Sequence, residues 1–300
     1  MKIVITGAAG WLGRHVATIL GSDHDLVLLD RVDPAEATIF DPSSPTGRSL
    51  APLAPSWPYQ QVDISDRDGL RAAFADADVV VHLAAWPTGT WDLASSTLET
   101  NIMGTVNVYE AARDAGVRRV LNASSINAYG TFYWRTSGRT PVRTSLPLTE
   151  AVPVEPEDPY SLSKAAGELI GGTYHRAFGI EVANLRFAGV WAEVTYEKAL
   201  ANGLPATTAW ADDLFQWVHV VDVTTGIGLA ATVPAVAPEP IVLGAADTRA
   251  PEPTLELIHR FQPDLAASLV EPLPGRAPLL SIARARTQLG YDPQFRLDAR

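Results

Sequence analysis

Cysteine is absent from the 300-residue sequence, which excludes disulfides, thiolate metal sites and cysteine nucleophiles. Basic residues are scarce: 23 lysines and arginines against 34 acidic residues leave a net charge of −11, so neither nucleic acid nor an anionic membrane is expected as a partner. No apolar run is long enough to span a bilayer and no signal-peptide pattern opens the chain, so we expect a soluble, cytoplasmic protein. The six histidines lack metal-ligand spacing, so no metal is expected.

Short apolar runs alternate with stretches of helical periodicity over about the first 190 residues. This pattern predicts an α/β fold of the Rossmann type, a doubly wound parallel sheet covered by helices on both faces. Strands are expected at Lys2–Thr6, Asp25–Asp30, Tyr59–Val62, Asp78–Leu83, Arg119–Ser124 and Glu181–Arg186. Helices are expected from Gly10 to Gly21, from a capping-box pattern at Ser96–Glu99 to Gly116, and from Asp158-Pro159 to about Gly179.

Two regions depart from this rhythm. Residues 32–58 contain six prolines, which predicts a long surface loop of undetermined role. After Arg186 we expect helices at Glu197–Asn202 and Asp222–Ala231 and extended segments at Val218–Val221 and Ile241–Leu243. We therefore predict a large domain over residues 1–186 and a smaller lobe over residues 187–300, with residues 218–245 returning to the large domain.

A glycine-rich segment follows the first strand and leads into the first helix, Thr6-Gly7-Ala8-Ala9-Gly10-Trp11-Leu12-Gly13. Glycine lets the backbone turn tightly and approach a pyrophosphate, whose charge is met by free N–H groups and the positive end of the helix. A purely structural turn would also use glycine. The strand before the segment, the helix after it and an acidic residue at the end of the second strand favour a dinucleotide site.

That acidic residue is Asp30, whose carboxylate could accept both ribose hydroxyls of an adenosine and would repel a 2′-phosphate. It therefore favours NAD over NADP, although the guanidinium of Arg31 beside it could bind that phosphate and leaves NADP open. Asp63 ends the third strand and either bonds the adenine amino group or caps the next turn through Ser65. The sequence does not separate these two roles.

Tyr160 and Lys164 stand four residues apart on the third predicted helix, so their side chains share a face. A phenol with a pKa of about 10 is a poor base at neutral pH. An ammonium about 4 Å away would stabilise the phenolate by up to roughly 4 kcal/mol, and an oxidised nicotinamide would add positive charge. Together they would let Tyr160 act as an acid/base. An ordinary amphipathic helix with a solvated lysine would show the same spacing.

Ser124 and Ser125 follow the fifth strand at the carboxyl edge of the sheet, where open α/β folds bind ligands. A hydroxyl there can donate to the substrate oxygen that becomes a carbonyl, although serines at strand ends also cap turns. The glycine-rich segment, the serines and the Tyr160–Lys164 pair all converge on this edge. Their combination indicates alcohol–carbonyl chemistry on a dinucleotide.

These segments resemble the extended short-chain dehydrogenase/reductase family, which contains NAD-dependent sugar epimerases, dehydratases and sugar dehydrogenases. The resemblance covers nearly the whole chain. It rests on Thr6–Gly13 (TGxxGxxG), His82-Leu83-Ala84-Ala85, Asn101 in Asn101-Ile102-Met103-Gly104-Thr105, Ser124–Gly130 (SSxxxYG), Pro159–Lys164 (PYxxSK) and His219–Val223 (HVxDV).

The resemblance implies roles for individual residues. Tyr160 would be the acid/base, Lys164 would bind the nicotinamide ribose and tune the tyrosine, and Ser125 would polarise the substrate oxygen. The cofactor NAD, with NADP not excluded, would contact Gly7, Gly10, Trp11, Leu12, Gly13, Asp30, Arg31, Asp63, Ile64, Leu83, Ala84, Ala85, Asn101, Tyr160 and Lys164. The family also implies a homodimer that pairs through helices spanning about Thr97–Arg113 and Pro159–Phe178.

Departures from the family pattern bear on the substrate. Dehydratases usually have an Asp-Glu pair just after the serine position, whereas Ile126-Asn127 stands here, so removal of water is disfavoured. Leu185–Ala192 differs from the LRxxNVYGP segment of nucleotide-sugar enzymes, and Gln216-Trp217 replaces an arginine-containing run before the HVxDV segment. The small second lobe, with few evident diphosphate ligands, favours a sugar or sugar acid without a nucleotide.

Aromatic residues follow the fourth and fifth strands and could stack on the C–H faces of a sugar, although a packed lid or a dimer surface would use them equally well. Candidate substrate contacts are Trp86, Thr88, Ser125, Asn127, Phe132 and Trp191. The favoured function is an NAD-dependent sugar or sugar-acid dehydrogenase. An NAD-retaining nucleotide-sugar epimerase and a non-catalytic nucleotide sensor on the same fold are the alternatives.

Overall fold

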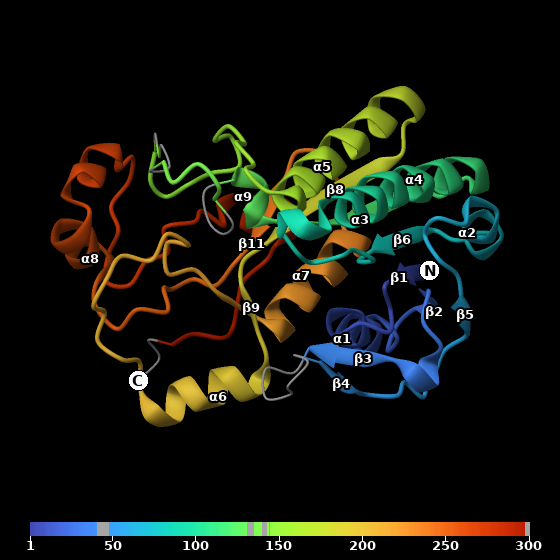
Figure 1. Cartoon of the computed structure of the whole chain (residues 1–300), viewed down its shortest axis with the longest axis horizontal. Coiled ribbons are helices and arrows are strands. Elements are labelled where there is room, and N and C mark those ends of the chain that lie inside the picture. The colour runs from blue at the N-terminus through green and yellow to red at the C-terminus, as the bar shows by residue number, and fades with distance from the viewer. Residues whose placement is uncertain (41–47, 131–134, 140–142, 144, 298–300) are drawn as a thin grey trace.

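A computed structural model describes the chain except for residues 41–47, 131–134, 140–142, 144 and 298–300. A seven-stranded sheet forms its centre, in the order β11-β8-β7-β6-β1-β2-β5, and every neighbouring pair is parallel (Figure 1). The strands are β1 Lys2–Thr6, β2 Asp25–Asp30, β5 Tyr59–Gln61, β6 Val79–His82, β7 Arg119–Ser125, β8 Glu181–Phe187 and β11 Ile241–Leu243. The predicted Rossmann-type sheet is confirmed, with ends that differ by at most one residue.

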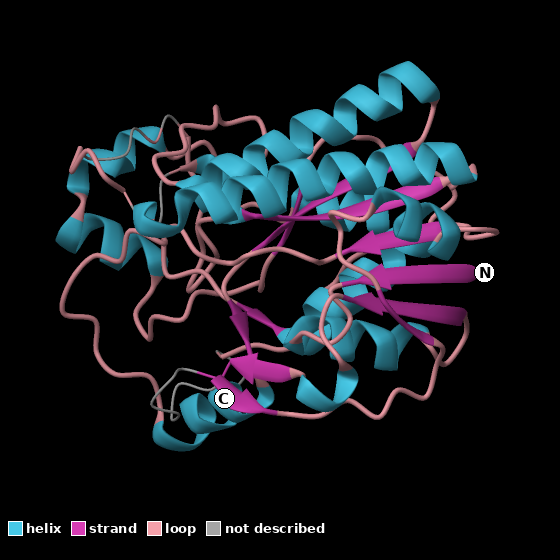
Figure 2. Cartoon of the chain, turned by 45° about the vertical axis from the view of Figure 1, so that its right-hand side comes forward, coloured by secondary structure: helices cyan, strands magenta, loops and turns pink. Residues whose placement is uncertain are grey.

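Helices cover both faces of the sheet, as Figures 1 and 2 show. On one face α1 (Trp11–Leu20) packs against α7 (Val220–Thr232), and α9 (Ala283–Leu289) packs against α7. On the other face α2 (Arg67–Ala73) packs against α4 (Gly104–Ala115), which in turn packs against α5 (Pro159–Phe178). Asp158 begins α5 as predicted, because its carboxylate accepts the N–H of Ser161 at 2.9 Å.

Alternation along each strand divides the core into two layers. In β1, Ile3 and Ile5 pack with α1 and α7, whereas Val4 lies between them in sequence and packs with α2 and α4. All three side chains are fully buried. Because both faces of the sheet are covered, the strand has no polar face, which explains its continuous apolar run in the sequence.

One level of the sheet is polar instead of apolar. Thr6, His82, Asn122 and Asn184 lie side by side in the register of β1, β6, β7 and β8. The Thr6 hydroxyl is 2.8 Å from His82 Nδ1, and Asn122 Nδ2 donates to Asn184 Oδ1 at 2.8 Å. The row is buried at the ends of β1 and β6 and three residues before the ends of β7 and β8. Its hydrogen bonds join β1 to β6 and β7 to β8 at the level where the candidate site begins.

The proline-rich region was wrongly predicted as a plain loop. It contains a 3₁₀ turn at Pro34–Glu36 and a short antiparallel hairpin of β3 (Thr38–Phe40) and β4 (Arg48–Leu50). None of the described paired residues is a proline, so each of them keeps its backbone N–H.

The predicted helix start at Ser96–Glu99 is also wrong. The helical run begins earlier with a 3₁₀ turn at Trp91–Leu93 and continues through α3 (Ala94–Leu98) and a π-helical stretch at Glu99–Met103 into α4. Ser96 therefore lies inside α3, and the Thr97 hydroxyl donates to the carbonyl of Thr88 at 3.4 Å. Because the 3₁₀ turn continues directly into α3, the sequence Ser96–Glu99 does not form a capping box.

The C-terminal part adds smaller elements beyond the main sheet. They are β9 (Val190–Trp191), α6 (Glu193–Asn202), β10 (Val218–His219), α8 (Thr254–Phe261) and a 3₁₀ helix at Pro263–Ser268. The segment predicted as extended to Val221 ends at His219, because α7 begins at Val220 with the His219 imidazole accepting the N–H of Val221. Among the described residues, no helix is long and apolar enough to cross a membrane.

Arg119 at the start of β7 ties α7 to the sheet. It is fully buried, and its guanidinium donates to the carbonyls of Ala230 and Ala231 at 2.9 and 3.0 Å and to Glu181 at 2.7 Å. Replacing Arg119 with Met leaves the carbonyls of Ala230 and Ala231 without this donor and Glu181 without its buried partner, so we expect the free energy of unfolding to fall by about 3 kcal/mol in urea titrations. Arg118→Met is the matched control, because Arg118 also contacts Glu181 but is half exposed, and we expect a loss under about 1 kcal/mol. Equal losses for both variants would contradict this role.

Candidate active site

The glycine-rich segment forms a tight turn between β1 and α1. Gly7 has a φ of +73°, and a Cβ added there would lie 2.7 Å from the backbone nitrogen of Ala84. A Cβ on Gly13 would lie 2.4 Å from the carbonyl oxygen of Gly7. Both glycines are therefore required by the turn itself.

Gly10 differs from these two glycines, because an added Cβ would meet only the Gly7 carbonyl, at 3.2 Å, and the residue lines an open cavity. Gly10 is also the N-cap of α1 and provides no side-chain cap. The first-turn N–H groups and the positive end of the helix are thus available to an anion. Trp11 and Leu12 lie in this first turn.

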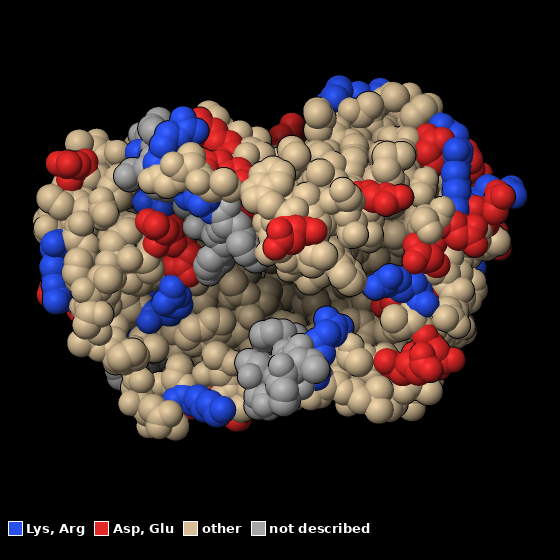
Figure 3. All heavy atoms as spheres, in the orientation of Figure 1, with Lys and Arg blue, Asp and Glu red and all other residues tan. Residues whose placement is uncertain are grey.

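A cavity of about 390 Å³ opens at this turn, at the point where the strand order reverses between β1 and β6. Most of the residues predicted to contact the cofactor line it, namely Gly7, Gly10, Asp30, Arg31, Asp63, Ile64, Leu83, Ala84 and Ala85, together with Trp86. Figure 3 shows that the surface is hollowed across the middle of this face.

Asp30 lies between the glycine turn and the cavity. One of its carboxylate oxygens accepts the N–H of Ala9 at 3.0 Å, and the other lies 3.4 Å from the N–H of Val32. Arg31 places its guanidinium 5.3 Å from the ring centroid of Trp86. Asp63 accepts the N–H of Ser65 at 2.8 Å and also lines the cavity, so the structure contains the predicted turn cap without excluding the adenine contact.

Asn101 holds the segment after β6 in place. Its side chain accepts the Trp86 N–H at 2.7 Å and donates to the Trp86 carbonyl at 3.1 Å. It also donates to the Ser163 hydroxyl on α5 at 3.0 Å. Asn101 is buried in the π-helical stretch, so it fixes the wall of the cavity relative to the helix that carries Tyr160.

The His82 ring lies between two buried hydroxyl groups, those of Thr6 and Thr105. The Thr105 hydroxyl donates to the Asn101 carbonyl at 2.6 Å, so it receives the proton of His82 Nε2 at 3.1 Å. The other ring nitrogen, Nδ1, then accepts from Thr6. Burial lowers the pKa of His82 to about 3, and the charge of Lys164 adds to this effect, so the ring is neutral at physiological pH.

Tyr160, Ser125 and Lys164 come together at the carboxyl edge of β7. Tyr160 forms a side-chain hydrogen bond with Ser125, whose hydroxyl also accepts the N–H of Asn127 at 3.1 Å. Lys164 donates to the carbonyl of Ala123 at 2.8 Å, with its nitrogen 5.4 Å from the centroid of the Tyr160 ring. Tyr160 and Lys164 are half-buried.

Burial dominates the electrostatics of this group. It raises the pKa of Tyr160 to about 12, and Asp158 adds to the rise, whereas the bond to Ser125 opposes it. Burial also lowers the pKa of Lys164 to about 8, while Glu168 acts in the opposite direction. We expect Lys164 and an oxidised nicotinamide together to lower the pKa of Tyr160. The groups of the protein do not lower this pKa without the nicotinamide.

Residues 3–244 match the model of a family described as the NAD dependent epimerase/dehydratase family. The chain belongs to this family. The membership confirms the resemblance to extended short-chain dehydrogenases that the sequence motifs indicated.

Relatives of the chain in this family include sugar dehydrogenases. An L-arabinose 1-dehydrogenase (NAD(P)(+)) of Haloferax volcanii is 36% identical over 191 residues, which are 62% of this chain and 65% of that protein, slightly under two thirds of its length. A uronate dehydrogenase of Pseudomonas putida is 27% identical over 251 residues, 83% of this chain and 77% of that protein. The crystal structure of a dTDP-glucose 4,6-dehydratase of Streptomyces venezuelae with bound NAD has a TM-score of 0.66 at 25% identity and covers 99% of this chain and 93% of that chain.

The predicted substrate contacts are only partly brought together in this family member. Asn127 is buried beside Ser125, and its Oδ1 has no hydrogen-bond partner among the described residues. Trp86 lines the cavity, whereas the Thr88 hydroxyl accepts the N–H of Thr90 at 3.4 Å within its own turn. The ring centroid of Trp191 lies 5.1 Å from that of Trp217, so Trp191 packs on another aromatic side chain of the C-terminal part of the chain. Phe132 lies outside the described residues.

Sequence reasoning missed several residues of the site. Thr38 and Arg48 come from the hairpin in the proline-rich region and line the cavity near Asp30. The hairpin was not predicted because the prolines of this region indicated a loop. Glu168 is bonded to Ser124 and Arg186, and the i, i+4 spacing after Lys164 is the signal that could have found it.

The neutral state of His82 makes stability depend on pH. Because its pKa is lowered on folding, the unfolded chain binds a proton that the folded chain does not bind between about pH 6.5 and 3, so stability is lost as the pH falls through this window. We expect this residue to contribute a slope of about 1.4 kcal/mol per pH unit. His82→Gln, which can still donate to Thr105 and accept from Thr6, should remove that contribution from urea unfolding measured across this range. A slope unchanged in the variant would contradict the assignment.

Proposed function

We propose that this family member is an NAD(P)-dependent dehydrogenase that oxidises a secondary alcohol or hemiacetal of a sugar or sugar acid. The observation that carries the proposal is the meeting of Tyr160, Ser125 and Lys164 at the same sheet edge as the glycine turn. The arabinose and uronate dehydrogenases among the relatives support this choice of substrate class.

The cavity residues fit a dinucleotide. The uncapped first turn of α1, with Gly10, Trp11, Leu12 and Gly13, would receive the pyrophosphate. Asp30 would accept the ribose hydroxyls, and Asp63 and Ile64 would lie against the adenine. Because the Asp30 carboxylate would repel a 2′-phosphate, we propose NAD as the main cofactor. Arg31 and Arg48 also line the cavity and would be the groups available to that phosphate, so NADP is not excluded. Residues 1–186 and 218–245 would form the cofactor domain, and the rest of residues 187–300 the substrate lobe.

The bound nicotinamide supplies a hydride acceptor and a positive charge. Tyr160 would take the proton of the substrate hydroxyl, while Ser125 holds the same oxygen by a hydrogen bond. Lys164, anchored on the Ala123 carbonyl, would bind the nicotinamide ribose and stabilise the phenolate. Leu83, Ala84, Ala85 and Asn101 would shape the wall beside the ring.

Asn127 distinguishes this site from one that removes water. Its buried Oδ1 has no partner among the described residues, so a substrate hydroxyl would satisfy it. An amide neither takes nor gives a proton near neutral pH, and Ile126 beside it is apolar. We therefore propose a sugar hydroxyl next to the oxidised carbon as the ligand of Asn127, with Trp86, Thr88, Phe132 and Trp191 as further contacts.

Net formation of NADH distinguishes a dehydrogenase from an epimerase, which returns the hydride to its substrate. Purified protein with NAD and a panel of aldoses and uronates should form NADH, followed at its absorbance band. Retained NAD without net NADH, together with conversion of a nucleotide sugar to its epimer, would instead establish the NAD-retaining epimerase. If calorimetry shows that neither NAD nor NADP binds at millimolar concentration, both functions fail.

Tyr160→Phe removes the acid/base without changing the ring. We expect kcat to fall by about 10²- to 10⁴-fold, with little change in NAD affinity, in the same absorbance assay. Tyr174→Phe is the matched control, because Tyr174 lies on the same helix and its hydroxyl contacts Glu110 instead of the site. Full turnover in Tyr160→Phe would overturn the role.

We also propose a homodimer through α4 and α5. Leu162 and Leu169 are seven residues apart, so they expose apolar side chains on one side of α5, and Leu169 is 69% exposed. Met103, just before α4, is exposed as well. Large apolar side chains that are exposed together mark protein interfaces.

Light scattering should therefore give the mass of two chains at micromolar concentration. Leu169→Arg should reduce it to one chain, because it places a charge in the apolar contact. Val270→Arg is the control, since Val270 is 67% exposed but lies outside these helices. A monomeric wild-type protein would exclude the dimer.

A further inference from the structure

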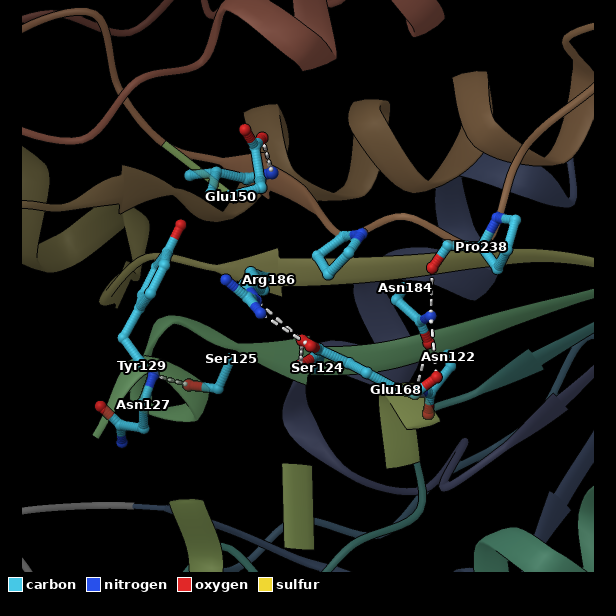
Figure 4. A network of polar contacts seen from close by, with 12 residues as sticks. Asn122, Ser124, Ser125, Asn127, Tyr129, Glu150, Glu168, Asn184, Arg186 and Pro238 are labelled. Atoms are coloured by element: carbon cyan, nitrogen blue, oxygen red, sulfur yellow. Dashed lines mark hydrogen bonds and ion pairs between the residues drawn. The ribbon is translucent and has the colours of Figure 1, made fainter. Parts of the chain in front are cut away.

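Glu168 extends the line of functional side chains on α5. Tyr160, Lys164 and Glu168 are spaced by four residues, so they follow one another along the same side of the helix. The Glu168 carboxylate accepts from the Ser124 hydroxyl at 2.5 Å and from two guanidinium nitrogens of Arg186 at 2.8 Å each (Figure 4). Glu168 thus joins the helix to the ends of β7 and β8.

Arg186 is the buried partner of this carboxylate. It lies opposite Ser124 in the register of β7 and β8 and is 2% exposed. Its guanidinium also lies 4.3 Å from the ring centroid of Tyr129, and Figure 4 shows both side chains beside the Ser124–Ser125 strand end. The ion pair therefore lies beside Ser124, the residue before the serine that bonds Tyr160.

Lys164 has both acidic and basic side chains around it. The charged and titratable groups that face it are Tyr160 and Glu168 from α5 and His82 from β6, with Arg186 from β8 behind Glu168. His82 is neutral, and β7 contributes only the Ala123 carbonyl as a direct contact. Glu168 is thus the one carboxylate among these groups, and its two cationic neighbours are the buried Arg186 and the half-buried Lys164.

We propose that Glu168 is a positioning residue that keeps Lys164 protonated and, through Ser124, holds the Ser125 strand end against Tyr160. The inference rests on the proposed dehydrogenase function for its consequence in catalysis. Its electrostatic part concerns the protein alone and can be tested without turnover.

The direction of the effect follows from the charges. Burial lowers the pKa of Lys164 to about 8, and Glu168 raises it. Removing the negative charge takes away the raising influence and leaves Arg186 facing Lys164, so the pKa of Lys164 falls further. At an i, i+4 separation this loss corresponds to about 0.5 to 2 pH units, depending on the local dielectric.

The titration of Lys164 can be observed directly, because the chain contains only three lysines, Lys2, Lys164 and Lys198. In protein labelled with ¹³C at lysine Cε, the resonance missing from Lys164→Arg identifies Lys164. We expect its midpoint to move to lower pH by about 0.5 to 2 units in Glu168→Gln. With NAD and an active sugar, the alkaline loss of kcat/KM should move by the same amount, since deprotonated Lys164 no longer supports the phenolate.

Glu181→Gln is the matched control, because Glu181 also pairs with a buried arginine, Arg119, but lies at the opposite end of β8. It should affect stability and leave the Lys164 midpoint unchanged. Glu168→Gln combined with Arg186→Gln removes both charges and should place the titration midpoint of Lys164 between those of the wild type and of Glu168→Gln. The double variant also provides the test if Glu168→Gln alone does not fold.

An unchanged Lys164 midpoint in both Glu168 variants, or an equal shift in Glu181→Gln, would overturn the proposal. Failure of the wild type to form NADH would remove the proposed function but not the shift of the midpoint. A shifted midpoint without a shift of the alkaline limb would overturn the catalytic part alone.

Discussion

The parallel register of β1, β6, β7 and β8 is the constraint on which the site depends. It places Thr6, His82, Asn122 and Asn184 at one level, where β1 and β6 end, while β7 and β8 continue for three more residues. The glycine turn follows Thr6, the cavity wall follows His82, and the serines lie two and three residues after Asn122. A slip of one residue in any pair would turn these side chains to the opposite face and separate the glycine turn from the tyrosine.

Buried polar groups at this level are tolerated because they satisfy one another. His82 bonds Thr6 and Thr105, and Asn122 bonds Asn184, so their desolvation is offset by hydrogen bonds. The neutral histidine adds no positive charge beside Lys164. A protonated ring there would place a second buried cation next to the ammonium, and its repulsion would favour the deprotonated lysine.

The strands and the glycine turn are predictable because their signals are local: a buried parallel strand is an apolar run, and a phosphate-binding turn is a short glycine pattern. Tyr160 and Lys164 are found for the same reason, being one helical turn apart. The hairpin that carries Thr38 and Arg48 is missed because the positions of the prolines do not indicate whether the residues between them form strands. The contact of Glu168 with Arg186 joins residues 18 apart through the packing of α5 against β8, which no local sequence pattern contains.

Close packing of α5 on the sheet lets side chains of the helix reach the carboxyl end of β7. Gly167 and Gly171 share the helical side of Tyr160 and Lys164, and added Cβ atoms would lie 3.3 Å from Asn122 and 2.6 Å from the Tyr109 hydroxyl. Each glycine costs about 1 kcal/mol of helix stability relative to alanine. The cost is offset by an approach close enough for Lys164 to reach the Ala123 carbonyl and for Glu168 to reach Ser124. A bulkier helix face would lift α5 from β7 and pull Tyr160 away from Ser125, so the glycines belong to the chemistry of the site as well as to its packing.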